Sequence, residues 1–259
     1  MPLVSIITPI YNSESFVADA VLSIMRQTFS DWELIAIDDC STDGSAHVVN
    51  AFLANDARIR LVQLPRNSGV AIARNKAIEL ATGRYIAFLD SDDLWCAVKL
   101  QRQIEFMQSK DIAFSYSAYE RLNESGNVLG IIGAPERLAY ADLLKTCSIG
   151  CLTAMYDTHK LGKIYMPTNT KREDFATWLK MLKKVEYAYG VNEVLAQYRV
   201  YAAQSSAKKT EMAKETWRLY RDVERLGFIK SMYYFSHYAV RGVLRAKFPC
   251  LARRLGVLH

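Results

Sequence analysis

Short apolar runs alternate with helix-length amphipathic segments over the first 116 residues, and this alternation limits the fold more than any other feature. The runs Leu3–Pro9 and Trp32–Asp38 are dominated by aliphatic and β-branched residues, which is typical of parallel strands buried on both faces. Three more strands are expected over residues 59–64, 85–89 and 112–116, and helices over 15–28, 44–53, 70–81 and 98–109. Gly83 is expected to end the helix over 70–81. The pattern predicts an α/β fold: a doubly wound, mostly parallel sheet with its ligand-binding loops at the carboxyl ends of the strands.

The second half of the chain is less regular and has the opposite charge. Its expected elements are a strand over 152–156, a helix over 175–184, a strand over 194–198, and helices from about 207 onward. Residues 1–159 hold 13 basic and 19 acidic residues, whereas residues 160–259 hold 20 and 8, and no acidic residue follows Glu224. An acidic half suits a cation site, and a basic tail suits an anionic surface, either nucleic acid or anionic lipid.

The tail segment 228–248 mixes aromatic and aliphatic residues with basic ones. It has two interpretations: a helix that packs on the core with a solvated basic face, or an interfacial helix on an anionic membrane. Nucleic acid is less favoured, because no known binding module accompanies the charge. Five scattered cysteines, no signal peptide and no apolar run of membrane-spanning length indicate a cytoplasmic protein, peripheral on the inner face of the cell membrane if the tail binds there.

Six carboxylates follow the predicted strands 2 and 4, at one edge of the sheet: Asp38, Asp39, Asp43, Asp90, Asp92 and Asp93. Any one of them could be a turn former or a helix cap, and Asp43 and Ser45 are expected to cap the helix over 44–53. Together they repel one another unless a cation binds, and hard oxygen ligands suit Mg²⁺ or Mn²⁺. The first strand–helix turn lacks G-x-G-x-x-G and the chain has no P-loop, so a bound diphosphate is expected to be held through the metal.

The runs VSIITPIYNSESFVADAVLSIMRQTFSDWELIAIDDCSTDGS and NSGVAIARNKAIELATGRYIAFLDSDD resemble the N-terminal half of the family 2 glycosyltransferases, which have the GT-A fold. The resemblance covers about residues 3–116. It implies inverting transfer of a sugar from a nucleotide-sugar, most often UDP-linked, with a divalent metal. A metal held at the diphosphate would stabilise the charge that builds there as the glycosidic bond breaks.

The resemblance also implies roles for individual residues in the first half. The expected nucleotide-binding residues are Pro9, Tyr11, Glu14, Asp38, Asp39, Arg74, Asp90 and Ser91. Among these, Asp39 would hydrogen-bond the uracil edge and Arg74 would lie beside the nucleotide. Asp90-Ser91-Asp92 matches the D-x-D motif, in which Asp92 would bind the metal, and the role of Asp93 is left open.

Two motifs of the second half resemble the same family. Glu173-Asp174 resembles the E-D motif, so Asp174 would deprotonate the acceptor hydroxyl and Glu173 would position the acceptor; the alternative is that both acids cap the helix that follows. The segment 197–201 resembles Y-R-x-H, but Tyr201 replaces the histidine, which puts a third protein ligand for the metal in doubt. Arg199 or the segment 204–206 is then the candidate contact for the diphosphate.

The sequence therefore predicts an inverting, metal-dependent glycosyltransferase that builds a surface polysaccharide or a lipid-linked glycan. The GT-A catalytic domain is expected over residues 1–206, with a nucleotide-binding part to about 118 and an irregular acceptor-binding part after it, followed by a basic helical C-terminal extension over 207–259. The alternatives are a phosphohydrolase with Asp90 as nucleophile, and a nucleotide-binding membrane scaffold without turnover.

Overall fold

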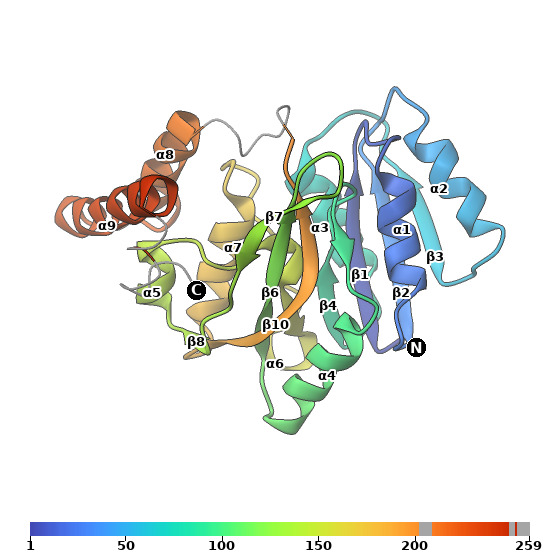
Figure 1. Ribbon diagram of the computed structural model, residues 1–259, viewed down its shortest axis with the longest axis horizontal. Coiled ribbons are helices and arrows are strands. Elements are labelled where there is room, and N and C mark those ends of the chain that lie inside the picture. The colour runs from blue at the N-terminus through green and yellow to red at the C-terminus, as the bar shows by residue number, and fades with distance from the viewer. Residues whose placement is uncertain (202–208, 249–251, 253–259) are drawn as a thin grey trace.

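A ten-stranded mixed sheet forms the centre of the protein, seen in a computed structural model that describes residues 1–201, 209–248 and 252. The main strand order is β3-β2-β1-β4-β9-β6-β10-β5, with β7 beside β6 and β8 beside β10 (Figure 1). The strands are β1 Val4–Ile10, β2 Trp32–Asp38, β3 Ile59–Gln63, β4 Tyr85–Phe88, β5 Leu94–Trp95, β6 Phe114–Leu122, β7 Val128–Ile132, β8 Arg137–Leu138, β9 Met155–Asp157 and β10 Ala188–Arg199. The helices are α1 Val17–Met25, α2 Ser45–Leu53, α3 Val70–Leu80, α4 Lys99–Ser109, α5 Tyr140–Lys145, α6 Thr158–Leu161, α7 Glu173–Leu182, α8 Lys209–Arg218 and α9 Phe228–Lys247, with a 3₁₀ turn at Cys151–Thr153.

The doubly wound first half is confirmed. Strands β2, β1 and β4 lie parallel, with Val4 beside Trp32 on one side and beside Tyr85 on the other. The ends of the first four strands and first four helices differ from the predicted ones by no more than about three residues. The agreement is close because every residue of β1 and β4 is buried, so these strands show the continuous apolar pattern of a sheet covered on both faces.

The fifth predicted strand is not a neighbour of β4. The segment 114–122 forms β6, longer than the predicted 112–116, and β9 lies between it and β4, antiparallel to both. The strand predicted over 152–156 is thus shorter than expected, because its first residues form the 3₁₀ turn, and it runs against its neighbours. The sheet remains mostly parallel, since β6 and β10 run parallel to each other.

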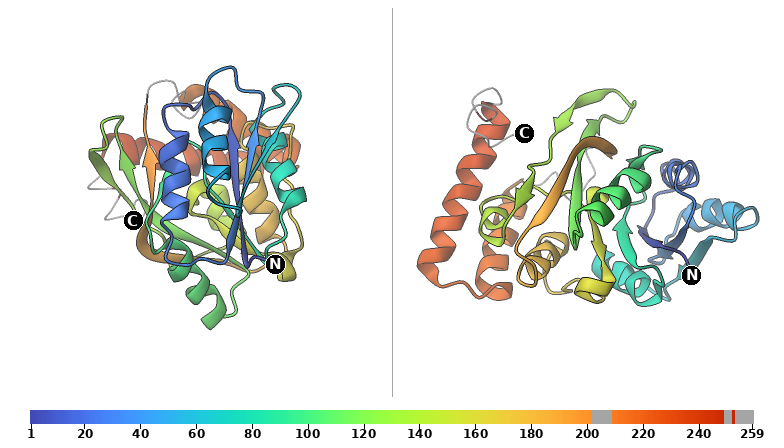
Figure 2. Two further views of the ribbon diagram at one scale, coloured as in Figure 1. Left: turned by 90° about the vertical axis from the view of Figure 1, so that its right-hand side faces the viewer. Right: turned by 90° about the horizontal axis from the view of Figure 1, so that it is seen from below.

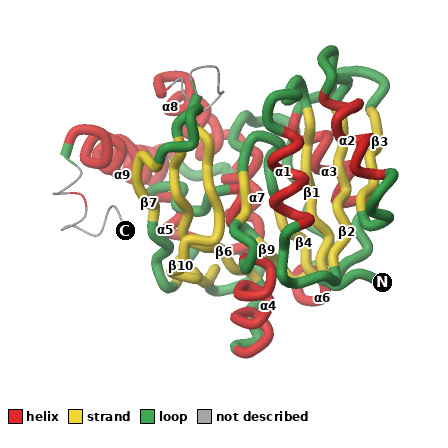
Figure 3. The backbone as a smooth tube through the Cα atoms, turned by 45° about the vertical axis from the view of Figure 1, so that its right-hand side comes forward, coloured by secondary structure: helices red, strands yellow, loops and turns green. Residues whose placement is uncertain are grey.

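Helices cover both faces of the sheet (Figures 2 and 3). The buried hydrophobic side chains form two cores. One core lies between the sheet and α1, α2 and α4, and includes Val21 and Ile104. The other lies against α3 and α7, and includes Ala77 and Trp178, whose indole contacts the ring of Phe88 at 5.4 Å between centroids. This three-layer arrangement fixes the strand ends at which the acidic residues lie.

Gly83 does not act as the predicted helix stop. Helix α3 ends at Leu80, and Gly83 is not among the glycines with positive φ. Instead, a Cβ at Gly83 would lie 2.6 Å from the backbone nitrogen of Ser5, and the Gly83 N–H donates to the Ser5 hydroxyl at 2.8 Å. The glycine is needed because the chain passes directly against β1 before it enters β4.

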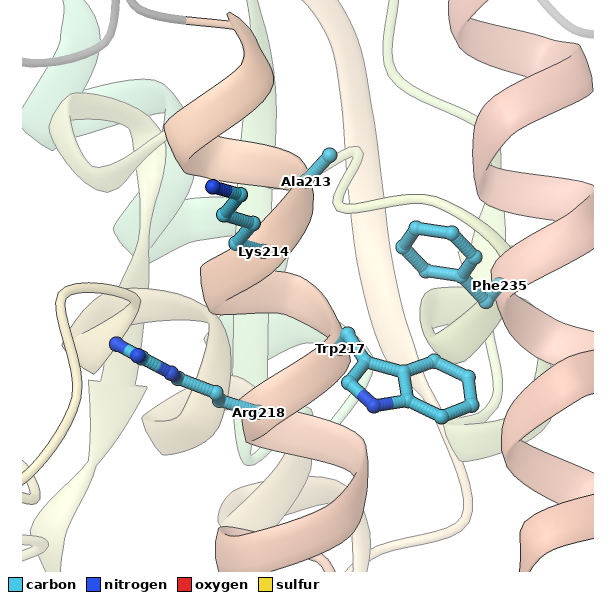
Figure 4. A pocket seen from close by; sticks show the side chains of 5 residues that line it. All are labelled: Ala213, Lys214, Trp217, Arg218 and Phe235. Carbon is cyan, nitrogen blue, oxygen red and sulfur yellow. The ribbon is translucent and has the colours of Figure 1, made fainter.

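The C-terminal helices form a layer of their own at the end of the molecule opposite α2 (Figure 1). A π-helical turn, Leu219–Val223, follows α8, and α9 runs beside them. Figure 4 shows the Trp217 indole of α8 facing Phe235 of α9, with 5.4 Å between the ring centroids. Within the described residues, no helix has both the length and the apolar character needed to cross a membrane.

Candidate active site

The loops after β1 and β2 each pass through a residue with left-handed backbone at the carboxyl edge of the sheet. Asn12 and Cys40 have φ of 45° and 62°, the left-handed region that side chains other than asparagine and glycine rarely adopt. Hydrogen bonds between the loops fix this geometry: the Asn12 N–H donates to the Ser41 hydroxyl, and the Asn12 side-chain carbonyl accepts from the Thr42 N–H at 2.8 Å. The two loops therefore act as one rigid rim.

Several acids predicted to bind the nucleotide also tie these loops together. The two carboxylate oxygens of Asp39, which is 3% exposed, accept from the backbone N–H groups of Ser68 and Gly69, each at 2.7 Å. Glu14 accepts from the Gly44 N–H at 3.0 Å, and a Cβ at Gly44 would overlap the Glu14 carboxylate. Asp38 is also buried and accepts from the Ser41 N–H. These hydrogen bonds shape the rim beside which the nucleobase of the sugar donor would lie.

The other residues expected to bind the nucleobase, and the residues expected to cap α2, lie at the same rim. Pro9 lies within β1, and Tyr11, directly after the strand, is half exposed. Asp43 accepts from the Ser45 N–H at 3.0 Å, while the N-cap position of α2 is Gly44. Asp43 therefore stabilises the first turn of α2 from one residue before the N-cap, and the prediction that Ser45 is a cap is wrong, because Ser45 is the first residue of the helix.

A cavity of about 1010 Å³ opens next to this rim and joins the two halves of the chain. Its lining includes Asp90, Asp92 and Asp93 from the loop after β4, and Glu173 and Asp174 from the start of α7. The wall further includes residues 68–72, residues 147–152, and side chains of α8 and α9. The D-x-D and E-D motifs, about 80 residues apart in the sequence, thus face one space.

Arg74 connects the two motifs through ion pairs. Its guanidinium contacts Asp90 at 2.5 Å and Glu173 at 2.9 Å, and its side chain is only 5% exposed. Burial alone would lower the pKa of Arg74, but Asp90 and Glu173 outweigh it and raise the pKa well above its usual value. Burial raises the pKa of Glu173 although Arg74 opposes this. Arg74 and Glu173, expected to contact nucleotide and acceptor separately, form one bridge here.

Strand β5 brings the end of β10 beside the D-x-D loop. Because β5 directly follows Asp93 and pairs with β10, the Asp93 carboxylate accepts from the Arg199 N–H at 3.0 Å. The Tyr201 hydroxyl donates to the Asp92 carboxylate at 2.8 Å, and the Tyr201 ring stacks on Phe16. Burial and Asp92 raise the pKa of Tyr201, so the phenol remains a hydrogen-bond donor. Tyr201, noted in the sequence only for the missing histidine, therefore contacts the expected metal ligand.

Arg199, a candidate diphosphate contact, is not among the residues that line the cavity. Its guanidinium contacts Asp19 of α1 at 2.6 Å and lies over the Phe16 ring. Ser91 is buried between the two aspartates of the motif. The alternative diphosphate contact, residues 204–206, lies outside the described part of the chain.

The donor groups around Asp92 fit a divalent metal that a diphosphate helps to hold. Across the described residues, no three His, Cys, Asp or Glu side chains converge as a complete ligand set. However, Mg²⁺ and Mn²⁺ are commonly bound by one or two carboxylates, with phosphate and water oxygens filling the other positions. Burial, together with Asp92 and Asp90, raises the pKa of Asp93 well above its usual value. This repulsion marks an excess of negative charge that a cation beside Asp92 would relieve.

Some of the cavity's lining residues had no role in the sequence interpretation: Tyr119, Cys147, Arg172, Tyr198 and Arg245. Arg172 directly precedes the E-D pair, so its position in the sequence could have indicated a place near the site. Nothing in the sequence separates Arg245 from the other basic residues of the tail.

Comparisons with known proteins agree with this geometry. Residues 5–145 match the family described as Glycosyl transferase family 2. The chain is 48% identical over 243 residues to the putative teichuronic acid biosynthesis glycosyltransferase TuaG of Bacillus subtilis, covering 93% of this chain and 96% of that protein. It is 37% identical to the UDP-Glc:alpha-D-GlcNAc-diphosphoundecaprenol beta-1,3-glucosyltransferase WfgD of Escherichia coli, covering 95% and 96%.

Solved structures show the same fold at lower identity. S. aureus TarS in complex with UDP-GlcNAc superposes with a TM-score of 0.72 at 22% identity, covering 95% of this chain and 73% of that one. The mannosyltransferase PcManGT of Pyrobaculum calidifontis, in complex with GDP-Man and Mn²⁺, has a TM-score of 0.69 at 17% identity, covering 98% and 79%. The fold is therefore the GT-A fold, and with the sequence matches above, the chain is a glycosyltransferase that belongs to glycosyl transferase family 2.

Proposed function

We propose that the protein transfers a sugar from a UDP-sugar, with inversion and with the help of a divalent metal, to an acceptor in polysaccharide biosynthesis. The observation that carries the proposal is the single cavity shared by the D-x-D loop and the Glu173-Asp174 pair. TarS supports a UDP-linked donor, because it is solved with UDP-GlcNAc, and PcManGT supports a metal, because it is solved with Mn²⁺.

In this mechanism each side of the cavity has its own task. The rim formed by Asp39, Glu14 and their loops would receive the base, and Asp92 would hold the metal at the diphosphate oxygens. Bound there, the metal would supply Lewis-acid stabilisation of the leaving diphosphate. Asp174 would take the proton of the acceptor hydroxyl, which attacks from the face opposite the diphosphate and so inverts the anomeric centre.

The names of the relatives support the acceptor class. TuaG is named for teichuronic acid biosynthesis and WfgD for a GlcNAc-diphosphoundecaprenol acceptor. We propose the same class here, a glycan or a lipid-linked sugar, with residues to about 118 binding the donor and the segment up to about 206 binding the acceptor. Family membership favours transfer over the phosphohydrolase and scaffold alternatives, and Asp90, the nucleophile of the first, is held by Arg74.

Titration of UDP and GDP, each with and without Mn²⁺, tests the donor side. We expect Mn²⁺ to strengthen UDP binding about tenfold or more, and Asp92→Ala to remove this gain, because Asp92 would hold the cation to which the diphosphate oxygens bind. Asp111→Ala, which removes an exposed acid far from the cavity, is the control and should bind like the wild type. UDP binding that is indifferent to Mn²⁺, or GDP bound as tightly as UDP, would contradict this part of the proposal.

The outer face of α9 supports a membrane surface as a further partner. Apolar side chains at helical spacing face solvent there: Phe228, Ile229, Met232, Tyr233, Val240 and Val243. Ile229 is 84% exposed. The chain after Glu224 has basic residues and no acidic ones, so we propose that this face lies on the anionic inner surface of the cell membrane.

Sedimentation with lipid vesicles tests this contact. We expect binding to vesicles that contain anionic lipid, little binding to neutral vesicles, and binding about tenfold weaker after Ile229→Ser/Val240→Ser, since each side chain would lose apolar burial. Val128→Ser/Ile131→Ser removes exposed apolar side chains from β7 and should not weaken binding. Equal binding by the two double variants would show that α9 is not the contact.

A further inference from the structure

Four cationic side chains line the cavity, and only two of them are neutralised by carboxylates among the described residues. Arg74 pairs with Asp90 and Glu173, and Lys171 pairs with Glu211 at 2.5 Å. Arg172 and Arg245 make no ion pair within the described part of the chain. Both side chains are partly buried, and taking a guanidinium out of water without an anionic partner costs free energy.

Arg172 is the N-cap residue of helix α7, immediately before the E-D pair. Its Nη1 is 3.9 Å from the sulfur of Met212, its guanidinium lies over the ring of Phe175, and its buried Nε has no hydrogen-bond partner. These neighbours are neutral or weakly polar. Burial would lower the pKa of Arg172 and the charge of Asp174 raises it against this effect, but the two side chains make no ion pair, so the donor capacity of the guanidinium is largely unused. An anion bound in the cavity would accept hydrogen bonds from the N–H groups of this guanidinium.

Arg245 reaches the same wall from α9. Its Nη2 donates to the Thr146 hydroxyl at 2.5 Å and its Nε to the Arg241 carbonyl, both of which are neutral partners. Burial lowers the pKa of Arg245, which is the direction expected for a cation that lacks a counter-ion. The inner side of α9 thus carries a charge into the cavity, while its outer side is apolar.

Cys147 lies among these charges and does not neutralise them. It interacts electrostatically with Asp174, Arg172 and Arg245, which places the two arginines and the expected base around one part of the wall. Burial raises the pKa of the Cys147 thiol to about 12, so it is neutral at ordinary pH. The two arginines therefore face the region where the acceptor hydroxyl would meet Asp174.

We propose that Arg172 and Arg245 form a subsite for an anionic group of the acceptor, either the diphosphate of a lipid-linked sugar or the carboxylate of a uronic acid unit. Both anions match the fork of N–H donors that a guanidinium presents. The inference rests on the proposed function for its assignment to the acceptor, and it makes α9 part of the acceptor site.

The position of the pair distinguishes this anion from the diphosphate of the sugar donor. The donor diphosphate is expected beside Asp92, in the D-x-D loop after β4. Arg172, in contrast, directly precedes α7, and Arg245 lies on α9. Helix α9 lies at the end of the molecule away from the β1–β3 rim (Figure 1). One cavity would then hold two anionic groups, one at each end, with the reacting atoms between them.

Binding of soluble probes to the full chain tests the subsite without requiring turnover. The probes are a short prenyl diphosphate-linked sugar, a glycoside that ends in a uronic acid, and an uncharged alkyl glycoside. We expect Arg172→Gln and Arg245→Gln each to weaken the binding of at least one anionic probe about 10- to 100-fold. This is the range for the loss of a hydrogen bond to a charged group. The uncharged glycoside and UDP should bind as to the wild type.

The pattern of losses identifies the anion or overturns the proposal. A loss of affinity confined to the diphosphate probe supports a lipid-linked acceptor. A loss of affinity confined to the uronic acid probe supports a growing acidic glycan. Equal loss for the uncharged glycoside, no loss at all, or a parallel loss of UDP affinity would overturn the subsite. Because UDP is titrated separately, a wild type that does not bind UDP would count against the proposed function and not against the subsite.

Three further variants serve as controls. Arg241→Gln removes a charge from the same helix, one turn before Arg245 and outside the cavity lining, and should bind every probe normally. Arg172→Lys and Arg245→Lys retain the positive charge but lose the forked N–H donors of the guanidinium. They should weaken the binding of the anionic probes less than the glutamine variants do. Should a glutamine variant not fold, the lysine variants still decide: unchanged binding of both anions would overturn the proposal.

Discussion

Asp174→Asn should leave UDP binding intact and slow sugar transfer by about 10²- to 10⁴-fold, the usual contribution of a general base. The reason is that the amide cannot accept the proton of the acceptor hydroxyl, although it has almost the shape of the carboxylate. Asp174 Oδ1 accepts from the Phe175 N–H at 2.6 Å, and the amide oxygen can keep this bond. The measurement is the initial rate of transfer at saturating donor, with UDP affinity determined in parallel.

The competing interpretation gives Asp174 only a structural role in the first turn of α7. There, with Glu173, it complements the helix dipole. Loss of that interaction would cost about 0.3–1 kcal/mol of stability and would leave the rate of transfer nearly unchanged. Urea unfolding of the same variant separates the two roles. A variant that transfers sugar at the wild-type rate would move the base away from Asp174, whatever its stability.

The first half of the fold could be predicted because its strands are buried on both faces. In β1, β2 and β4 burial leaves a mainly apolar run that indicates a strand whatever its neighbours are. The place of β9 could not be predicted, because its three residues give no period and the pairing with β4 and β6 joins segments about 40 to 70 residues apart. Sequence pattern reports local burial and does not report which strands become neighbours.

The candidate site likewise has a part that could be predicted from the sequence and a part that could not. Carboxylates that end strands, such as Asp90 and Asp92, were predicted because the topology alone brings them to one edge. The bonds of Asp39 to Ser68 and Gly69, and of Tyr201 to Asp92, depend on how distant loops approach one another. Which side of α9 faces the cavity depends on how the helix packs, so Arg245 was indistinguishable from the other basic residues of the tail. The resemblance supplied roles for the motifs but not the contacts between them.

Arg74→Gln should be the most destabilising of the single substitutions considered, because it removes the cation shared by Asp90 and Glu173. Breaking a buried pair by removing one partner costs about 3–5 kcal/mol, since the other charge stays buried. We expect the lower end of this range, because the Asp90 side chain is 27% exposed and can turn toward water. The measurement is the free energy of unfolding in urea. Lys76→Gln, which breaks an exposed pair with Glu79, is the control and should cost less than about 1 kcal/mol.

A double-mutant cycle shows whether the bridge is the cause. Glu173→Gln alone leaves Arg74 paired with Asp90, whereas the double variant Arg74→Gln/Glu173→Gln replaces both residues with neutral groups that can hydrogen-bond each other. If the ion pair dominates, the double variant should be more stable than the sum of the two single losses predicts, by about 1–3 kcal/mol. Strictly additive losses would mean that Arg74 stabilises the protein through its packing or through Asp90. Glu173 would then be free of the bridge and available to position the acceptor, as the sequence first suggested.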